Sequence, residues 1–436
     1  MNWLDRLAAI PGTIVSAAAE TIQLLPLEGA LPNLALATSF RHPWIDLWRW
    51  NGIRTFCLEE SFPDAPATTT ELLLHPATLE WLSSLPAPVR VLVFKPEDRV
   101  EQTLGRAGIE LLNPHAGLSR RLENKLNFPA LAAEAGLDSL PYSFFTLSDA
   151  LEPATVFDEL GDRVIIQFAK GFSGNRTFLV RSGDEFRAVR DRFRDRKCRI
   201  CAFRDGATWT ANGCVVSPFQ VTVRPPFMQI TRWSDYRDGL PPTVGSRGNL
   251  WAPPAPDVAQ WITTAMEATG RMLGRYGFRG IFGADFLHTP DDGRTVMIEI
   301  NPGLVASIPI LTPIEMTRGM PLIAAHILAL TSDEIQQEIE PIEIPTRGGQ
   351  IIFRGSDEGV DALSREMGSG IYRVSSDRGF EWVSDGWSPS HVRGSQCLIW
   401  KPPIEKTLYS ERLRLVFDQE SDTWGDDPVL FFHRHL

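Results

Sequence analysis

Residues 279–307 read RGIFGADFLHTPDDGRTVMIEINPGLVAS, a stretch that predicts two antiparallel strands at about 279–288 and 294–301. The residues between them are typical of a turn: Thr289, Pro290, Asp291, Asp292 and Gly293. Side chains alternate between the two faces of a strand, so an apolar face fixes the pairing register. That apolar face is predicted to consist of Phe282, Ala284, Phe286, Val296, Ile298 and Ile300.

Three oxygen-bearing side chains share the other face of this hairpin. A turn symmetric about Asp292 places Asp285 opposite Glu299, and Gly283 opposite Asn301. Two carboxylates that face each other across a ladder repel, unless one is protonated or a cation lies between them. Carboxylate and amide oxygens suit Mg2+ that also holds the phosphates of a nucleotide. The alternative is the solvent-exposed face of an edge hairpin, which the hairpin alone does not exclude.

A strand ending in Asp285, a short turn, a strand ending Glu-Ile-Asn-Pro and a small-residue segment resemble the metal-binding end of the ATP-grasp superfamily. The layout is similar to its carboxylate–amine ligases, of the D-alanine:D-alanine ligase and carboxylase types. The resemblance implies an α/β (α+β) chain in which two α+β lobes clasp ATP. It also implies that Asp285, Glu299 and Asn301 hold one or two Mg2+ ions, with Mn2+ as an alternative metal, against the ATP phosphates.

The 436 residues exceed what one hydrophobic core normally organises, which predicts several domains. Residues 1–115 are predicted to form an α/β domain with a mostly parallel sheet, beginning with an Ala-rich helix. This region lacks a GxGxxG motif, so it predicts no Rossmann dinucleotide site. The resemblance assigns residues 116–340 to the ATP-grasp domain, with a flap lobe at about 137–205. Short strands with Gly and Pro between them predict a β-rich C-terminal domain at 341–436.

A net charge of −11 argues against nucleic acid or an anionic membrane as partner, since both favour basic surfaces, and leaves small molecules as the expected partners. Five cysteines are scattered along the chain, and Cys198 and Cys201 form a CxxC within an apolar strand. This setting favours buried free thiols over a zinc or redox site. No run of about 18 apolar residues occurs, so we expect a cytoplasmic protein. The sequence leaves open whether the chain forms a homodimer.

Lys125 lies in a segment that predicts a helix from an N-cap at Ser119, restarted at Pro129 and closed by Gly136. On pattern alone it is an ordinary surface lysine of a charged helix. The resemblance instead implies that Lys125 reaches the ATP phosphates.

Two strands at 164–168 and 177–180 flank a loop with two glycines and a serine. Most such loops are simple turns, but backbone N–H groups of a glycine-rich loop can also close over phosphate oxygens. The resemblance implies the second role for Lys170, Gly171, Ser173, Gly174 and Arg176. The family often has a lysine where Gln167 stands, so Lys170 or Arg176 would supply the positive charge, or Gln167 a neutral hydrogen bond.

The apolar strand 197–203 corresponds to the family's hinge, where backbone groups of about Ala202 and Phe203 would pair with the adenine edge. Further on, the Pro, Gly and Trp-rich stretch 221–256 predicts a long irregular segment, which is usually functional in a compact enzyme. The segment 231–251 is predicted to recognise the substrate, with Arg247 chosen to bind a carboxylate; arginines near it are Arg224, Arg232 and Arg237.

The clearest helix spans 258–276, and a second at about 321–330 carries His326, which is expected to be packed or exposed rather than catalytic. The implied reaction has two steps: a carboxylate attacks the γ-phosphate of ATP, and an amine captures the acyl phosphate, releasing phosphate. An amino acid or peptide is the expected substrate. Many relatives have arginine where Gly303 stands, and Arg279 or Arg318 is predicted to replace it at the acyl phosphate.

Two other functions remain open at this stage. A biotin-carboxylase-like enzyme would use bicarbonate; the chain lacks a Met-Lys-Met biotinyl sequence, but a carrier can be a separate protein. A nucleotide-binding module without chemistry is the non-enzymatic alternative, and the complete set of predicted metal ligands argues against it.

Overall fold

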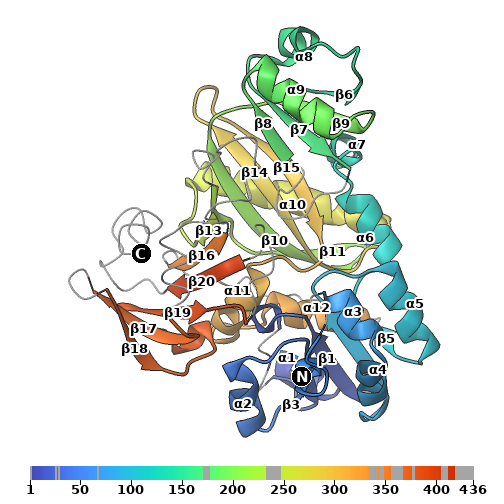
Figure 1. Cartoon of the computed structure of the whole chain (residues 1–436), viewed down its shortest axis with the longest axis vertical. Coiled ribbons are helices and arrows are strands. Elements are labelled where there is room, and N and C mark those ends of the chain that lie inside the picture. The colour runs from blue at the N-terminus through green and yellow to red at the C-terminus, as the bar shows by residue number, and fades with distance from the viewer. Residues whose placement is uncertain are drawn as a thin grey trace.

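The described part of the chain forms three β-sheets with helices packed against them (Figure 1). The computed structural model describes residues 2–24, 27, 30–65, 68–169, 177–231, 247–332, 339, 342, 348–354, 367–375, 379–403 and 411–417. The predicted α/β (α+β) class is confirmed, because a parallel sheet and two mainly antiparallel sheets occur in one chain.

The first sheet has five parallel strands in the order β3-β2-β1-β4-β5. Its strands are β1 (Thr13–Ala17), β2 (Leu34–Thr38), β3 (Arg54–Cys57), β4 (Val89–Val93) and β5 (Glu110–Leu111). Its helices are α1 (Trp3–Ala8), α2 (Pro43–Trp50), α3 (Thr69–Leu74), α4 (Pro76–Ser83) and α5 (Asp98–Arg106). The parallel sheet predicted for the N-terminal region is therefore confirmed.

The Ala-rich N-terminal helix is only partly correct. Helix α1 ends at Ala8, and Thr13–Ala17 is the buried central strand β1. Gly12 separates the two elements with φ +82°, and a Cβ at this position would lie 1.9 Å from the Pro88 carbonyl oxygen. This close approach needs glycine and turns the chain into the sheet.

The second sheet, which we call the flap sheet, is antiparallel and has the strand order β6-β9-β7-β8. It consists of β6 (Tyr142–Thr146), β7 (Val164–Phe168), β8 (Thr177–Val180) and β9 (Lys197–Ala202). Helices α8 (Pro153–Leu160) and α9 (Gly183–Arg192) belong to the same lobe, which lies at the top of Figure 1. These strands fall within the range predicted for the flap lobe.

The third sheet, which we call the central sheet, has eleven described strands. Its order begins β15-β14-β10-β12-β13, and β11 pairs with β10. These strands are β10 (Ala207–Ser217), β11 (Gln220–Val223), β12 (Phe227–Thr231), β13 (Arg247–Leu250), β14 (Gly280–Thr289) and β15 (Arg294–Pro302). The segment 221–256 was predicted to be irregular, but it contributes three of these strands.

The sheet continues into the C-terminal region through pairing of β13 with β16, in the order β16-β20-β19-β17-β18. These strands are β16 (Gly349–Arg354), β17 (Gly370–Ser375), β18 (Gly379–Ser384), β19 (Gln396–Trp400) and β20 (Glu411–Phe417). The C-terminal region is β-rich as predicted, and its described strands extend the central sheet. The boundaries proposed at 115 and 340 stay predictions.

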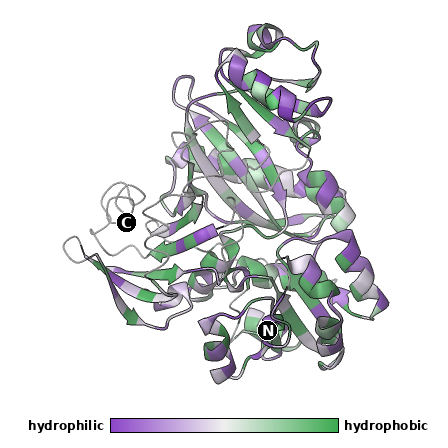
Figure 2. Cartoon of the chain, in the orientation of Figure 1, coloured by the Kyte–Doolittle hydropathy of each residue, from purple (hydrophilic) through white to green (hydrophobic). Residues whose placement is uncertain are grey.

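Five helices complete the central region: α6 (Ala116–Glu123), α7 (Phe128–Glu134), α10 (Pro256–Arg275), α11 (Ile308–Met316) and α12 (Leu322–Thr331). Hydrophobic residues concentrate on the sheets, whereas the outer helices carry hydrophilic residues (Figure 2). Helix α10 buries Ile262, Met266 and Met272 against the central sheet, which matches its 3.6-residue periodicity. No helix in the described part of the chain combines the length and apolar character needed to cross a bilayer.

His326 on α12 links β14 to the end of the parallel sheet, after β5. Its Nδ1 accepts a hydrogen bond from the Ile281 N–H at 3.0 Å, and its Nε2 lies 3.1 Å from the Leu112 carbonyl oxygen. The side chain is fully buried, and burial lowers its pKa to about 4. His326 is thus a packed histidine, as expected from the sequence.

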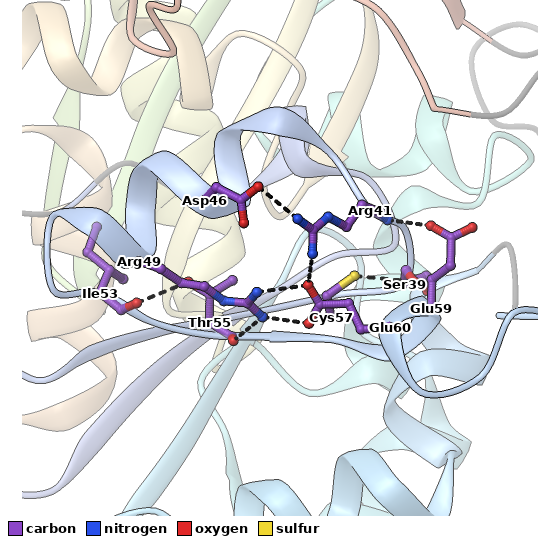
Figure 3. Close-up of polar contacts among 9 residues, drawn as sticks. All are labelled: Ser39, Arg41, Asp46, Arg49, Ile53, Thr55, Cys57, Glu59 and Glu60. Atoms are coloured by element: carbon purple, nitrogen blue, oxygen red, sulfur yellow. Dashed lines mark hydrogen bonds and ion pairs between the residues drawn. The ribbon is translucent and has the colours of Figure 1, made fainter.

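A second group of charges lies beside the carboxyl ends of β2 and β3 (Figure 3). Arg49 donates two hydrogen bonds to the Glu60 carboxylate, at 2.8 and 2.7 Å, and one to the Thr55 carbonyl at 3.0 Å. Arg41 also pairs with Glu60, and it pairs with Asp46 at 2.7 Å. We call these residues, with Glu59, the N-terminal charge cluster. Within this cluster, the hydrogen bonds that Arg49 donates lower the pKa of the Glu60 carboxyl.

Candidate active site

The β14–β15 hairpin has the predicted register at its carboxylate end, where Asp285 pairs with Glu299 and Gly283 with Asn301. A β-bulge follows, so that Phe286 pairs with Met297. The extra residue changes the alternation on β15: Met297 is fully buried and joins the core as well as the cavity wall, whereas Ile298 is only partly buried and lines the cavity without joining the core. The placement of Ile298 on the core face was therefore wrong.

The two opposed carboxylates have specific partners. The Thr210 hydroxyl donates to Asp285 Oδ1 at 2.7 Å, and the Asn301 amide lies 3.4 Å from Asp285 Oδ2. Glu299 Oε2 accepts from the Lys125 ammonium at 3.0 Å. Both carboxylates line the cavity, so the exposed edge hairpin considered above does not apply.

The oxygen set of Asp285, Glu299 and Asn301 fits a hard divalent cation such as Mg2+, since it offers two carboxylates and an amide oxygen on one rigid hairpin. The described residues contain no group of three or more His, Cys, Asp or Glu side chains that could hold a metal. A cation here would therefore depend on these two carboxylates, the amide and oxygens of its ligand. The three metal ligands stay predictions.

Lys125 reaches the cavity because the predicted continuous helix is broken. Helix α6 begins at Ala116, so Ser119 is not its N-cap, and it ends at Glu123. Asn124 is extended, and the Lys125 N–H then lies 3.4 Å from the Ala169 carbonyl oxygen. Lys125 is only 5% exposed. A surface lysine is thus excluded, and its ammonium faces Glu299.

The cavity has a volume of about 400 Å3, a size typical of small-molecule sites. It lies between the antiparallel flap sheet and the central sheet, with Ile165 and Cys201 on one side and Leu287 and Met297 on the other. Charged and polar groups line the rest of it, among them Lys125, Gln167, Arg199, Asp285 and Glu299. An apolar region thus adjoins a charged one, which suits a ligand with an aromatic base and anionic groups.

Gln167 and Arg199 are cross-strand neighbours on β7 and β9. Both side chains are buried and line the cavity, and Arg199 Nη2 donates to Gln167 Oε1. Five residues of the predicted glycine-rich loop lie outside the described residues: Lys170, Gly171, Ser173, Gly174 and Arg176. Their predicted contacts with phosphate stay predictions.

Ala202 and Phe203, the predicted hinge residues, line the cavity. Their N–H groups, however, donate within the protein, to the carbonyl oxygens of Pro141 and Arg163, both at 2.9 Å. These two N–H groups therefore do not face the cavity as donors, which corrects that part of the prediction. Arg204, the next cavity-lining residue, becomes the better candidate for an N–H donor to a base.

Of the three predicted catalytic arginines, Arg279 and Arg318 have described side chains, and neither lines the cavity. Arg279 directly precedes β14, six residues before Asp285, and its Nη2 lies 3.1 Å from the Val216 carbonyl oxygen; Arg318 is exposed beyond α11. The Arg247 backbone begins β13, but its side chain lies outside the description, as does the segment 232–246. Their roles stay predictions.

Arg224, grouped with the substrate-recognition segment in the sequence, is fully buried and pairs with Glu315 at 2.9 Å. It links the end of β11 to α11 and has no access to substrate. Gly303 has φ +125°, a conformation strained for other residues.

No protein-family model matches the sequence, and no curated protein matches it significantly. Solved structures do match. The Hydrogenobacter thermophilus 2-oxoglutarate carboxylase biotin carboxylase domain, with MgADP, ADP and bicarbonate, has a TM-score of 0.62 at 12% identity, covering 94% of this chain and 87% of that one. The Campylobacter jejuni biotin carboxylase, in a beta-gamma-ATP complex, has a TM-score of 0.61 at 15% identity, covering 95% of this chain and 89% of that one. The Aspergillus clavatus carboxyaminoimidazole ribonucleotide synthase, with ATP, has 0.59 at 12%, covering 100% of both.

The chain has the ATP-grasp fold. Identities of 12–15% support the fold alone, so the activity is argued below from the residues. Within the ATP-grasp fold, the sequence reasoning missed Arg199 and Thr210. Arg199 alternates with Cys201 in an apolar strand, and period-two reading would have placed both on the cavity face. Thr210 gave no such signal, because its role depends on pairing between β10 and β14.

Proposed function

We propose that the chain is an ATP-dependent ligase that activates a carboxylate as an acyl phosphate and transfers the acyl group to an amine, giving ADP and phosphate. The observation that carries the proposal is the Lys125–Glu299 contact opposite Asp285, inside a cavity bounded by two sheets. A buried lysine and two opposed carboxylates can together organise a metal-bound polyphosphate.

Each part of the cavity has a defined task in this proposal. The apolar region beside Met228, Leu287 and Met297 holds the base and excludes water, and the backbone of Arg204, next to the hinge, supplies an N–H to the base. Lys125 holds phosphate oxygens. Thr210 fixes the Asp285 carboxylate so that Asp285, Glu299 and Asn301 hold Mg2+. When bound, Mg2+ neutralises phosphate charge during transfer.

The acyl acceptor is expected beyond the metal-binding end of the hairpin. A Cβ on Gly303 would lie 3.8 Å from the Phe94 carbonyl oxygen, which places the segment after β15 against the carboxyl end of β4. Ligands of parallel sheets generally bind at that edge. The carboxylate oxygen attacks the γ-phosphorus and ADP leaves; the amine nitrogen then attacks the acyl carbon, losing a proton as phosphate leaves.

A second candidate is a carboxylase that uses bicarbonate as the carboxylate. Its support is that similar structures matching nearly the full chain include biotin carboxylases and a carboxyaminoimidazole ribonucleotide synthase, one of them with bicarbonate bound. Bicarbonate would give a carboxylated amine rather than an amide.

ATP and small reactants, together with buried free cysteines at all five positions, support the cytoplasm as the compartment we propose.

The test is ATP-dependent ADP release with amino acids, short peptides and bicarbonate, each alone and with amines, followed by mass spectrometry of products. An amide product supports the ligase, and a product heavier by labelled CO2 from bicarbonate supports the carboxylase. Nucleotide binding without ADP release in any combination would favour the non-catalytic module instead. A wild-type chain that binds no adenine nucleotide would refute all three.

A further inference from the structure

We propose that Arg199 binds a phosphate group of the nucleotide, and that Gln167 positions its guanidinium. The inference rests on the proposed nucleotide site and adds a residue to it. Arg199 is 5% exposed, its Nη2 donates to Gln167 Oε1, and both side chains line the cavity. The contact is with a neutral amide, so it leaves the positive charge uncompensated.

Charge balance distinguishes Arg199 from a structural arginine. Within the described residues, no carboxylate forms an ion pair with it, and its Nε has no hydrogen-bond partner although it is buried. The Phe128 ring lies 4.9 Å from the guanidinium carbon and offers a cation–π contact, which compensates a buried charge only in part. Arg224, equally buried, also has one unpartnered nitrogen, Nη1, but its charge is compensated by Glu315 at 2.9 Å. The structure thus leaves Arg199 in need of an anion.

The position of Arg199 specifies the kind of anion. Cross-strand pairs place Ile165 beside Cys201 near the hinge and Gln167 beside Arg199 next along the strands. Lys125 comes next in this direction along β7, because its N–H contacts the carbonyl of Ala169, two residues beyond Gln167. Arg199 is three residues from Ala202, about 10 Å along a strand.

This order runs from an apolar region through Arg199 to the Lys125–Glu299 contact. The same order of groups, apolar base first and terminal phosphate last, occurs along a nucleoside triphosphate. Lys125 already faces a carboxylate at the far end, so Arg199 is placed to contact the phosphates closer to the ribose. A guanidinium can bind two phosphate oxygens at once, which suits this intermediate position.

The experiment compares Arg199→Met with wild type in calorimetric binding of ATP, ADP and adenosine, using the full chain. We expect ATP and ADP affinity to fall roughly 10- to 100-fold, while adenosine affinity changes less than about threefold. Thermal stability should stay unchanged or rise, since the variant removes an uncompensated buried charge. Arg194→Met is the matched control: this exposed arginine of the same lobe pairs with Asp149 at 3.0 Å, and its loss should leave ATP binding unchanged.

A double variant, Gln167→Lys with Arg199→Met, moves the positive charge to the neighbouring strand and should restore at least part of the ATP affinity. It also serves if Arg199→Met alone folds poorly. Equal weakening of ATP and adenosine, or wild-type ATP affinity in Arg199→Met, would overturn the inference while leaving the proposed function intact. A wild-type chain without nucleotide binding would overturn both.

Discussion

The cavity and the N-terminal charge cluster contain the same kinds of side chain in opposite situations. In the cluster, Arg49 makes three hydrogen bonds within the protein, and Glu60 receives both Arg41 and Arg49 (Figure 3). In the cavity, Arg199 is almost fully buried, contacts a neutral amide and retains an unpartnered Nε. The exposed charges are satisfied, and the buried one is not.

This difference separates charges that serve the fold from charges that serve a ligand. Exposed ion pairs contribute little to stability, because water already solvates each partner. A buried charge without a full partner is costly, so a folded chain retains it where a ligand completes the site. Changes in the cavity should therefore affect binding and turnover more than stability, and changes elsewhere should do the reverse.

The largest expected effect comes from Glu299→Gln. The variant keeps the shape of the side chain and removes one of two opposed charges that the proposal assigns to Mg2+. We expect ATP-dependent ADP release to fall on the order of 100-fold or more, with little change in thermal stability. Steady-state kinetics and a melting curve measure both. Full activity in the variant would remove Glu299 from the metal site.

Lys125→Met should have the next largest effect on the cavity. The variant preserves the apolar stem and removes the ammonium that faces Glu299. ATP affinity should fall roughly 10- to 100-fold and adenosine affinity little, because only phosphates lose a partner. Titration with both ligands provides the measurement. A similar loss for adenosine would mean that Lys125 supports the cavity walls instead.

The sequence predicted the carboxylate end of the cavity well because its geometry is local. Asp285 and Glu299 lie on one hairpin, so their register follows from side-chain alternation and a short turn. The same reasoning failed at Ile298, where a bulge adds one residue that no local pattern announces. It also failed at Thr13–Ala17, where small apolar residues read as helix form the central strand of a sheet.

Other features were beyond the sequence because they depend on distant contacts. The break after Glu123 that turns Lys125 inward became visible only with its contact to Ala169 on the flap lobe. The hydroxyl of Thr210 reaches Asp285 because β10 pairs with β14, across 75 residues of chain. Contacts between segments far apart in the sequence decide both, and neither segment encodes its partner.

His326 tests the comparison with a buried group that the protein itself satisfies. Its pKa is about 4 in the folded chain and near 6.5 when unfolded, so the unfolded state gains a proton first as the pH falls. The contribution of neutral, buried His326 to the unfolding free energy is therefore complete above about pH 6.5 and is lost as the pH falls toward 4. Between pH 7 and pH 5 the unfolding free energy should fall by about 2 kcal/mol.

Replacing His326 with Asn should lower stability at pH 7 and flatten this dependence, without changing ATP affinity at pH 7 in the folded protein. Urea denaturation at several pH values measures the slope. An unchanged slope in His326→Asn would assign the acid sensitivity to other groups, of which buried His42, with a pKa lowered to about 4 by burial, is the first to examine.

The smallest effect is expected from Arg49→Met in the N-terminal charge cluster. Glu60 keeps Arg41 as a partner, and the side chains of Arg49 and Glu60 are 35% and 27% exposed, so solvent screens what is lost. We expect a loss of less than about 1 kcal/mol in unfolding free energy, smaller still at high salt, and unchanged ADP release. Melting curves at low and high salt, with kinetics on the same samples, measure this.

The cluster also lies at the carboxyl edge of the parallel sheet, where substrates of such sheets bind. A tenfold loss of ADP release with normal stability would therefore place Arg49 in the substrate site, and would show that a fully paired charge can still serve a ligand.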